Sequence, residues 1–343
     1  MSVLENNKTP GIDQQAVTLW FKELLPSVLP PLTFGLISGG HSNLTYLITD
    51  ASGAKWILRR PPLGELMPTA HDVNREYTVM AALQNTDVPV PKTIGFCNDN
   101  AITGAPFYIM SCAQGMVLHD EEDSIKYLGT DERSVVSESL VDTLIAFQNI
   151  DIDAVGLGDL GRREGYLARQ LKRFSRNYDL CEPSNPKPMY AIHDELKKST
   201  PTQGPATLVH GDYRLGNCTC SPCGQITAIL DWETCTLGDP LIDISLMLAI
   251  WSNTAPTQPR TATSAPGFWT PERVLSAYAE RCGRDVSNIN YYLAFQFWRM
   301  SVIYEEIAAR YRSGAYGAAR KETDIKDAAE YYMRKASTVL DQL

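Results

Sequence analysis

The sequence predicts an α+β protein with two lobes, a small antiparallel sheet with one helix and then a larger, mainly helical lobe. Three observations lead to this prediction. The chain has 343 residues, more than the ~100–200 typical of one domain. Short alternating segments separated by Gly, Pro, Asn and Asp run from about residue 34 to 111. From about residue 115 onward, apolar residues recur instead at helical spacing.

The first part of the chain justifies this prediction element by element. Apolar residues at helical spacing predict a helix over 12–25, which Pro26 and the Pro30-Pro31 pair end. Thr69 is expected to cap a helix whose regularly spaced apolar residues, from Val73 to Leu83, lie on one face. Alternation bounded by turn residues predicts five strands, over 34–37, 44–49, 55–60, 93–97 and 106–111.

The second part reads as helices with one β-hairpin among them. The helices are expected around 136–147, 166–174 and 291–311, and the hairpin near 217–231, turning through Ser221 to Gly224. The expected organisation is therefore an N-terminal helical segment over 1–29, a small lobe with the sheet over 30–112 and a larger, mainly helical lobe over 113–343. A ligand is expected between the lobes.

Composition narrows the classes of function. With 44% hydrophobic and 21% charged residues the chain is typical of a folded globular protein, and its net charge of −9 argues against nucleic acid or an anionic membrane as a partner. The longest apolar stretch, 241–251, is too short to span a membrane, and the first ten residues lack a secretory signal. Eight sparse cysteines favour a reducing, cytoplasmic setting.

One constellation of residues carries chemistry. The segment 208–217 reads Leu-Val-His-Gly-Asp-Tyr-Arg-Leu-Gly-Asn, and 229–233 reads Ile-Leu-Asp-Trp-Glu. Phosphoryl transfer needs one carboxylate for the attacking hydroxyl and further oxygen ligands for Mg²⁺. Asp212 can serve the hydroxyl, Asn217 can offer an amide oxygen to the metal, and the hairpin is expected to return Asp231 beside Asn217. The pattern therefore predicts a phosphotransferase.

These motifs resemble the aminoglycoside-phosphotransferase-like (choline-kinase-like) branch of the protein-kinase fold. The resemblance includes Gly-Asp-Pro-Leu-Ile-Asp at 238–243, Gly-Gly-His-Ser-Asn at 39–43 and Trp-Ile-Leu-Arg-Arg at 56–60, and it covers roughly residues 30–310. The subgroup that it resembles most is the kinase domain associated with acyl-CoA dehydrogenases. The implied fold is a two-lobed, protein-kinase-like α+β fold, and the implied cofactors are ATP (or GTP) and Mg²⁺.

The resemblance also implies roles for individual residues. Asp212 matches the catalytic aspartate, Asn217 and Asp231 match the Mg²⁺ ligands, and His210 would brace their loop. Arg59 takes the place of the strand lysine that contacts the phosphates, and Glu76 that of the helix glutamate that pairs with it. The remaining implied nucleotide contacts are Gly39, Gly40, Ser42, Asn43, Met110 and Ser111.

Two departures from the kinase pattern keep a catalytically silent nucleotide-binding regulator open as an alternative. Arginine for lysine at position 59 exchanges a compact ammonium for a planar fork. The loop 38–43 has two glycines but lacks the kinase Gly-x-Gly-x-x-Gly pattern. Asp239 and Asp243 are expected to brace the polypeptide after the hairpin rather than to contact substrate.

The acceptor is predicted from charge. Between 162 and 176 lie six basic residues and one acid, and Arg169, Lys172, Arg173 and Arg176 share a helix face. Such a face is either simply solvated or recognises an anionic acceptor such as a hydroxyacyl-CoA, whereas an aminoglycoside or macrolide kinase would meet a cationic drug. Arg299 and Trp251 are candidates to line the acceptor pocket, although a large aromatic residue such as Trp251 is more often buried in the core.

Three cysteines crowd the predicted hairpin. Cys218, Cys220 and Cys223 suggest zinc, but a structural site needs four ligands and no second pair exists nearby. They are therefore interpreted as incidental surface cysteines. The sequence predicts an ATP- and Mg²⁺-dependent kinase for a small-molecule hydroxyl, with a functional association with acyl-CoA metabolism and no nucleic-acid or membrane partner.

Overall fold

The computed structural model describes residues 9–37, 43–63, 72–183, 186–252, 255, 258–312 and 322–343. The chain divides into two compact units, and the first runs to Gly115 and also contains Thr227–Cys235. The second comprises Met116–Ile226 and Thr236–Leu343. The domain limits expected from the sequence stay a prediction.

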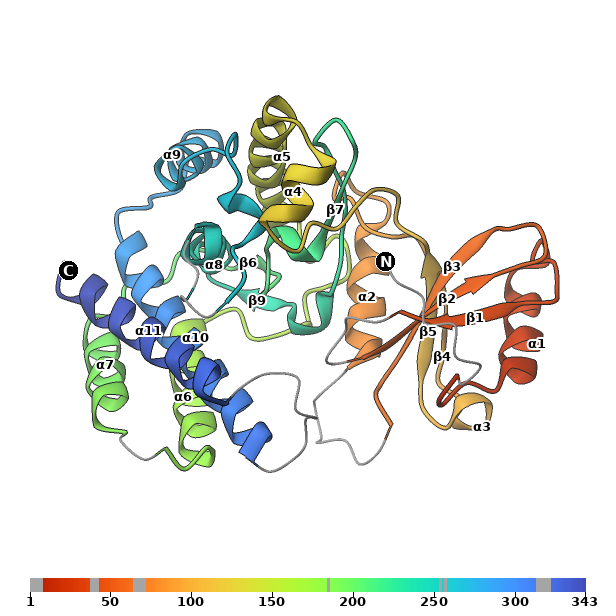
Figure 1. The fold of residues 1–343 in the computed structure, drawn as a ribbon, viewed down its shortest axis with the longest axis horizontal. Coiled ribbons are helices and arrows are strands. Elements are labelled where there is room, and N and C mark those ends of the chain that lie inside the picture. Colours follow the sequence, from red (N-terminus) through yellow and green to blue (C-terminus); the bar gives the residue numbers. More distant parts are fainter. Residues whose placement is uncertain are drawn as a thin grey trace. The chain divides into compact units, whose positions relative to one another are not determined.

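The first unit is built around a five-stranded antiparallel sheet in the order β1-β2-β3-β5-β4 (Figure 1). The register places Thr45 of β2 and Tyr108 of β5 on either side of Arg59 in β3. The elements in chain order are α1 (Gln14–Leu24), β1 (Thr33–Leu36), β2 (Leu44–Thr49), β3 (Lys55–Arg60), α2 (Val73–Leu83), β4 (Thr93–Cys97), α3 (Asn100–Thr103) and β5 (Phe107–Ser111).

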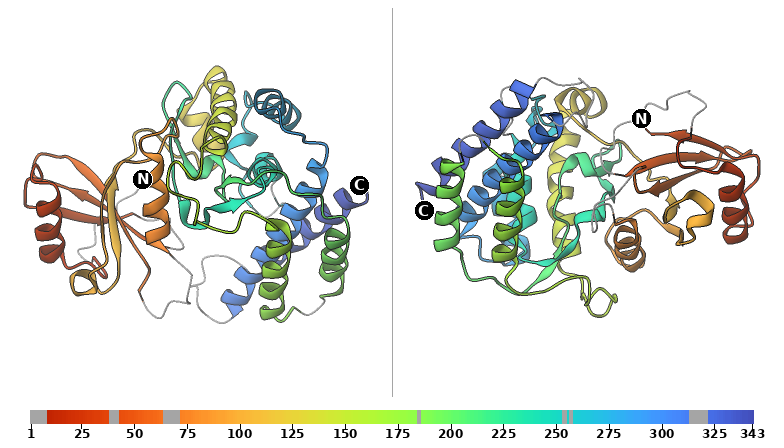
Figure 2. Two further views of the ribbon diagram at one scale, coloured as in Figure 1. Left: turned by 180° about the vertical axis from the view of Figure 1, so that it is seen from behind. Right: turned by 90° about the horizontal axis from the view of Figure 1, so that it is seen from below.

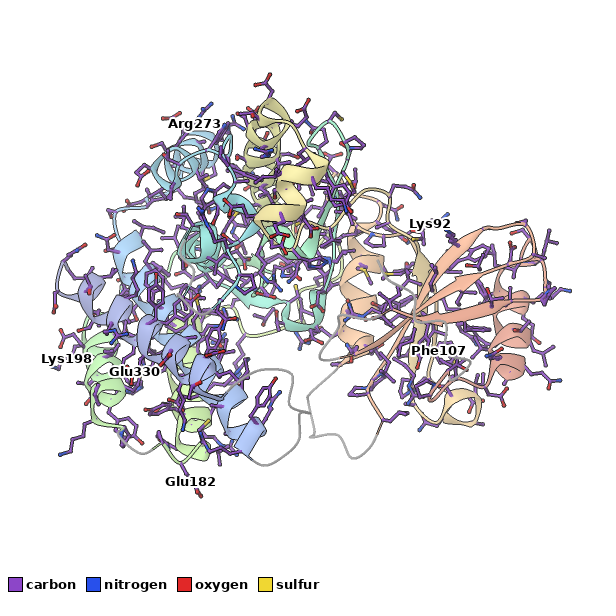
Figure 3. All side chains as sticks on the ribbon, in the orientation of Figure 1. Lys92, Phe107, Glu182, Lys198, Arg273 and Glu330 are labelled. Carbon is purple, nitrogen blue, oxygen red and sulfur yellow. The ribbon has the colours of Figure 1, made fainter. Side chains whose placement is uncertain are left out.

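Two helices cover the two faces of this sheet (Figures 1 and 2). The α1 face forms a hydrophobic core in which Phe21 packs against side chains of the sheet, and the Trp20 ring lies edge-on to Phe107 at 4.8 Å between centroids. Phe107 is labelled in Figure 3. The α2 face is different, because it carries buried Glu76 opposite buried Arg59. One face therefore stabilises the sheet and the other holds charges.

The second unit is mainly helical, with a short antiparallel pair of strands, β6 and β9, at its centre. Strand β6 leads into the His-Gly-Asp loop, and β9 leads into helix α8. The helices are α4 (Glu121–Tyr127), α5 (Thr130–Gln148), α6 (Tyr166–Leu180), α7 (Lys187–Lys198), α8 (Leu241–Trp251), α9 (Pro271–Cys282), α10 (Ile289–Arg312) and α11 (Glu322–Leu340). The short elements are β6 (Thr207–Val209), η1 (Leu215–Asn217), β7 (Cys218–Cys220), β9 (Thr236–Gly238) and η3 (Ala262–Ser264), while β8 (Ile226–Ile229) and η2 (Trp232–Thr234) lie on the segment that returns to the first unit.

Helix α8 forms the core of the second unit. It is apolar on all sides and buried except at Ile250, as expected for a helix without a solvent face. Helices α10 and α11 lie side by side (Figure 1), and the Tyr332 ring stacks on Phe297 and Tyr304 between them. Among the described residues, no helix is both long and apolar enough to cross a bilayer.

The α+β class and the five strands predicted from the sequence are confirmed. Two expectations were wrong. Helix α2 is capped by Asp72, whose carboxylate accepts the Arg75 N–H, and the predicted cap Thr69 lies outside the described residues. Cys218 and Cys220 are fully buried, so they are core residues rather than incidental surface cysteines, and only Cys223 is exposed. Cys220 also exchanges two backbone hydrogen bonds with Met116.

Candidate active site

Arg59 stands at the centre of the charged face of the first unit. Its Nη1 lies 2.5 Å from Glu76 Oε1 on α2, and its Nη2 lies 3.2 Å from Asp231 Oδ1 on the returning segment. The side chains of Arg59 and Glu76 are 10% and 1% exposed. The pairing of Arg59 with Glu76 that the resemblance implied is confirmed, and the planar fork extends it to a second carboxylate.

Burial dominates the electrostatics around Arg59. It raises the pKa of Glu76 to about 7, against the lowering effect of Arg59, and the nearby charges of Asp231 and Glu233 add to the rise. Burial alone would lower the pKa of Arg59, but Glu76 and the other neighbouring acids raise it above its ordinary value. Burial and then the Glu76 carboxylate also raise the pKa of the Tyr108 hydroxyl. Three acids around one guanidinium leave this region short of positive charge.

The segment that carries Asp231 is held in an unusual backbone conformation. Asp231 has φ +67° and ψ +58°, the left-handed region that costs an ordinary residue energy and that aspartate tolerates better than most. Two residues on, Glu233 accepts a hydrogen bond of 3.2 Å from the Asn43 side chain, which is 3% exposed. This contact fixes the C-terminal end of the predicted phosphate loop to the returning segment. Gly39, Gly40 and Ser42 lie outside the described residues.

Met110 and Ser111 end strand β5, where the sequence predicted a nucleotide-binding hinge. Met110 is 6% exposed and pairs with Ile57. The Ser111 N–H donates to the Lys92 carbonyl at 2.8 Å, and the Ser111 hydroxyl accepts from the Lys92 N–H at 2.9 Å. The backbone N–H of Ser111 is therefore already used at the edge of the sheet. Contacts of Met110 and Ser111 with a nucleotide stay a prediction.

In the second unit, the His-Gly-Asp loop presents Asp212. Gly211 has φ +84°, which a side chain would strain, so glycine is required between His210 and Asp212. Asn217 Nδ2 donates to the Asp212 carboxylate at 2.7 Å and to its backbone carbonyl at 2.9 Å. The structure therefore brings together two of the three residues predicted to carry the chemistry. Asp231 belongs to the other unit, and its convergence with them stays a prediction.

A buried carboxylate braces this loop from behind. Asp243, which is 0% exposed, accepts the backbone N–H groups of His210 and Gly211 at 2.8 Å each. Burial raises the pKa of Asp243, and His210 and the two backbone bonds oppose the rise. His210 Nδ1 in turn accepts the Asp212 N–H at 3.2 Å. Asp239 instead accepts the Leu241 N–H at 3.0 Å, at the start of α8, and the Tyr292 hydroxyl at 2.7 Å. It therefore braces the polypeptide after the hairpin, as expected, whereas Asp243 braces the loop ahead of the hairpin instead.

Arg214 is a residue of this loop that the sequence analysis passed over. Its Nε lies 3.3 Å from Asp212 Oδ2, and the two side chains are 42% and 37% exposed. A Cβ at Gly216 would collide with the Arg214 guanidinium, so glycine makes room for this cation. The sequence signal that could have identified Arg214 is its position, a basic residue two positions after Asp212.

The basic residues of α6 divide into two groups. Arg169 turns back to donate to the Glu164 and Arg162 carbonyls, so it holds the loop ahead of the helix. Arg173 lies 4.9 Å from the Phe174 ring centre, and Arg299 of α10 lies 5.4 Å from the same centre. Partial burial and the like charge of Arg299 lower the pKa of Arg173. Arg299 also donates to the Gly211 carbonyl at 2.8 Å, which links this pair to the catalytic loop.

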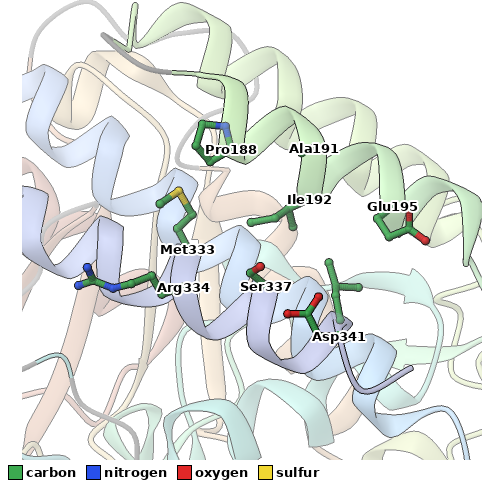
Figure 4. Close-up of a pocket in the computed structure, with 9 residues that line it drawn as sticks. Pro188, Ala191, Ile192, Glu195, Met333, Arg334, Ser337 and Asp341 are labelled. Carbon is green, nitrogen blue, oxygen red and sulfur yellow. The ribbon is translucent and has the colours of Figure 1, made fainter.

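The described residues of the second unit form, among others, two pockets. The first, here called the loop-side pocket, is lined by 118–119, by 214–216 of the catalytic loop, by 261–263 and by Met247, Ile250 and Trp251 of α8. Trp251 is both 2% exposed and part of this lining. The second is a groove between α7 and α11 (Figure 4). Its lining includes Ile192, Glu195, Met333 and Arg334 but no residue of the catalytic loop.

With this geometry in place, the chain can be compared with known proteins. The model of a family described as "Phosphotransferase enzyme family" matches residues 33–275, well over half of the chain. The chain belongs to this family. The match contains the sheet with Arg59, the catalytic loop with Asp212 and the returning segment with Asp231. The resemblance on which the sequence analysis relied is therefore confirmed.

Curated relatives of this phosphotransferase are much longer proteins. Mouse (Mus musculus) acyl-CoA dehydrogenase family member 10 is 32% identical over 332 residues, which cover 93% of this chain but 30% of that protein. Rat (Rattus norvegicus) acyl-CoA dehydrogenase family member 11 is 32% identical over 292 residues, 82% of this chain and 37% of that protein. The chain thus spans about a third of the length of these relatives.

Solved structures support the kinase-like fold. A putative aminoglycoside phosphotransferase from Ralstonia eutropha superposes with a TM-score of 0.81 at 30% identity, covering 95% of this chain and 98% of that one. Aminoglycoside phosphotransferase APH(4)-Ia, solved with ADP and hygromycin B, gives a TM-score of 0.62 at 15% identity over 95% and 98% of the two chains. An amicoumacin kinase with AMP-PNP and Ca²⁺ gives 0.62 at 19% identity over 97% and 94%. The last two show the fold alone.

Proposed function

We propose that this phosphotransferase moves the terminal phosphoryl group of ATP (or GTP) to a hydroxyl of a small-molecule acceptor. Asp212 orients the attacking hydroxyl and accepts its proton, and Arg59, anchored by Glu76, contacts the phosphates. Catalysis then comes from positioning and charge compensation rather than from a covalent intermediate. The observation that carries the proposal is the Asp212–Asn217 pair at 2.7 Å, braced from behind by Asp243.

The donor set fits a hard divalent cation such as Mg²⁺. Asn217 donates both hydrogen bonds of its Nδ2 to Asp212, which leaves its Oδ1 to serve as a ligand. Asp231 contributes a carboxylate from a region with more acids than cations. Oxygen ligands of this kind are those that Mg²⁺ prefers. When bound, the metal would neutralise the charge that develops on the phosphates.

For the acceptor we propose an anionic thioester of the hydroxyacyl-CoA type. Arg173 and Arg299 bring two like charges to one aromatic ring beside the catalytic loop, an arrangement that a phosphate-bearing ligand would stabilise. The names of the curated relatives place phosphotransferase-like sequences in proteins named for acyl-CoA dehydrogenation. The same names support a functional association with acyl-CoA metabolism. All eight cysteines are free thiols, which fits a reducing, cytoplasmic compartment.

An antibiotic kinase is the second candidate, because the structural neighbours include proteins solved with hygromycin B or amicoumacin. A catalytically silent nucleotide-binding regulator is the third, motivated by Arg59 in the lysine position. The three candidate functions differ in the acceptor with which the protein would consume ATP. The first requires hydroxyacyl-CoA, the second requires a drug, and the third consumes no ATP with either.

The test is ATP consumption by the purified chain with a panel of hydroxyacyl-CoAs and aminoglycosides, with phosphorylated products identified by mass spectrometry. Asp212→Asn should lower turnover about 10³-fold to 10⁴-fold, because it removes the base at the acceptor. Its nucleotide affinity should change less than about twofold, since the neutral side chain keeps the shape of the loop. The matched control is the exposed Asp87→Asn, which should behave as the unmodified chain. Equal turnover in the two variants would refute the assignment of Asp212.

A further inference from the structure

The loop-side pocket offers an apolar wall immediately beside the catalytic loop. Leu118, Leu215, Met247 and Trp251 are all buried apolar residues of its lining, and they come from three separate parts of the second unit. Trp251 is fixed in place because its Nε1 donates to the Trp269 carbonyl at 2.8 Å. This bond fixes the orientation of the largest side chain of the wall.

The two threonine hydroxyls of this lining already have a hydrogen-bond partner. Thr261 and Thr263 both donate their hydroxyl hydrogens to the Trp251 carbonyl. They therefore bring no free hydroxyl donor to the pocket. Nor does the lining contain an acidic side chain. An ammonium group would lose solvation here without an anionic partner, whereas a hydrocarbon chain would gain.

One lining residue connects the pocket to the reacting atoms. Arg214 is part of the lining, and its Nε lies 3.3 Å from the Asp212 carboxylate. Gly216 lines the same pocket and leaves the space that the Arg214 guanidinium occupies. A molecule whose hydroxyl sits at Asp212 can therefore extend its next atoms past Arg214 into the apolar wall.

We propose that the loop-side pocket, whose volume is about 50 Å³, binds the part of the acceptor's hydrocarbon chain next to the hydroxyl and limits the chain length that the enzyme accepts. This inference rests on the proposed function, and it adds the part of the site that selects among hydroxyl-bearing acceptors. The occupant is an aliphatic chain on the side of the hydroxyl away from the anionic group. Ala262 and Ile250 set the width of the pocket, the former buried and the latter partly exposed.

Two substitutions should move chain-length preference in opposite directions. Ala262→Leu adds three carbons to the wall, so KM for an eight-carbon hydroxyacyl-CoA should rise at least about tenfold relative to the four-carbon compound, at roughly fourfold per excluded methylene. Ile250→Ala widens the pocket at a partly exposed position, so it should shift the optimum towards longer chains even if the leucine variant folds poorly. Ile125→Ala, exposed on α4, is the matched control and should leave the profile unchanged.

Turnover and binding measured on the same series separate this inference from the proposed function. If the acceptors are phosphorylated and all variants share one chain-length profile, the pocket assignment is overturned while the kinase assignment stands. If the unmodified chain phosphorylates none of them, the proposed function fails, and calorimetric binding of the same series decides the pocket. Affinities that rise with chain length and shift in opposite directions in the two variants would support the pocket, and identical affinities would overturn it.

Discussion

Two arginines of this chain each hold two carboxylates, but in opposite surroundings. Arg59 in the first unit has Glu76 at 2.5 Å and Asp231 at 3.2 Å, and its side chain is 10% exposed. Arg281 on α9 of the second unit has one carboxylate at 2.6 Å and another at 2.5 Å, and its side chain is 35% exposed. The carboxylates of Arg281 lie one turn apart on α5, whereas those of Arg59 come from segments 155 positions apart (231 − 76).

The comparison distinguishes an exposed group of charges, at Arg281, from a buried group, at Arg59, whose presence stability alone does not explain. Exposed pairs such as that of Arg281 contribute at most about 1 kcal/mol and lose little solvation. A buried pair loses several kcal/mol of solvation per ion, so a chain selected for stability alone would do as well with apolar residues at Arg59 and Glu76. Perturbed buried charges cluster at functional sites for this reason. This agrees with the role proposed for the Arg59 cluster, that of a phosphate and metal anchor.

The largest expected difference comes from removing one carboxylate of each pair. Glu76→Ala leaves Arg59 buried with a single weaker partner and should lower the free energy of unfolding by about 3 kcal/mol or more. Glu138→Ala at the exposed pair should cost less than about 1 kcal/mol. Denaturant titration of both variants of the full chain measures the two losses. Equal losses would show that burial does not distinguish the pairs.

The next effect concerns ligand binding rather than stability. Asp231→Ala should weaken binding of Mg²⁺-ATP about tenfold to a hundredfold, because it removes a ligand of the metal. Binding of ATP without a divalent ion should stay nearly constant. Asp142→Ala removes the equivalent partner of Arg281 and should change neither affinity. Isothermal titration calorimetry with and without Mg²⁺ provides the measurement, and an unchanged Mg²⁺-ATP affinity in Asp231→Ala would remove Asp231 from the metal site.

The pairing of Arg59 with Glu76 could be predicted well from the sequence. Strand alternation placed Arg59 on an inward face, helical spacing placed Glu76 beside Val73 and Met80, and the two meet in the structure. Strands 44–49, 55–60 and 93–97 were predicted at their observed limits because turn residues bound each of them. Both kinds of signal are local, since they depend on residues a few positions apart.

Long-range packing was beyond the same reasoning. The sequence placed Cys218 and Cys220 at the surface, because nothing within the hairpin indicates that other parts of the chain bury them. Arg214 was passed over because its importance depends on the space left by Gly216 and on the distance to Asp212. Helices α7, α9 and α11 were not predicted individually, since they carry no motif; α7 packs against α11, and α9 packs against α5 and α8.

A smaller effect distinguishes the two arginine clusters by pH. In the unfolded chain Glu76 ionises near its ordinary pKa of about 4.3, whereas burial raises its folded pKa to about 7. Folding therefore takes up a proton between these values, and stability should fall as pH rises from about 4.5 to 7. Glu76→Gln should flatten this slope, and Glu138→Gln should leave it intact. Unfolding titrations at pH 5 and 7.5 measure the change, and a slope that survives Glu76→Gln would contradict the assignment.

The smallest expected effect is at another arginine–carboxylate pair, Arg214 with Asp212, whose side chains are 42% and 37% exposed. Gly216→Ala would place a Cβ where the Arg214 guanidinium lies, and the flexible side chain would move away rather than the backbone. Stability should change by less than about 1 kcal/mol, while kcat/KM should fall roughly threefold to tenfold. Gly204→Ala is the matched control, since a Cβ there meets no atom. Both alanines restrict the unfolded chain alike, so a loss of kcat/KM confined to Gly216→Ala would show that Arg214 positions the catalytic carboxylate, and equal activities would show that it does not.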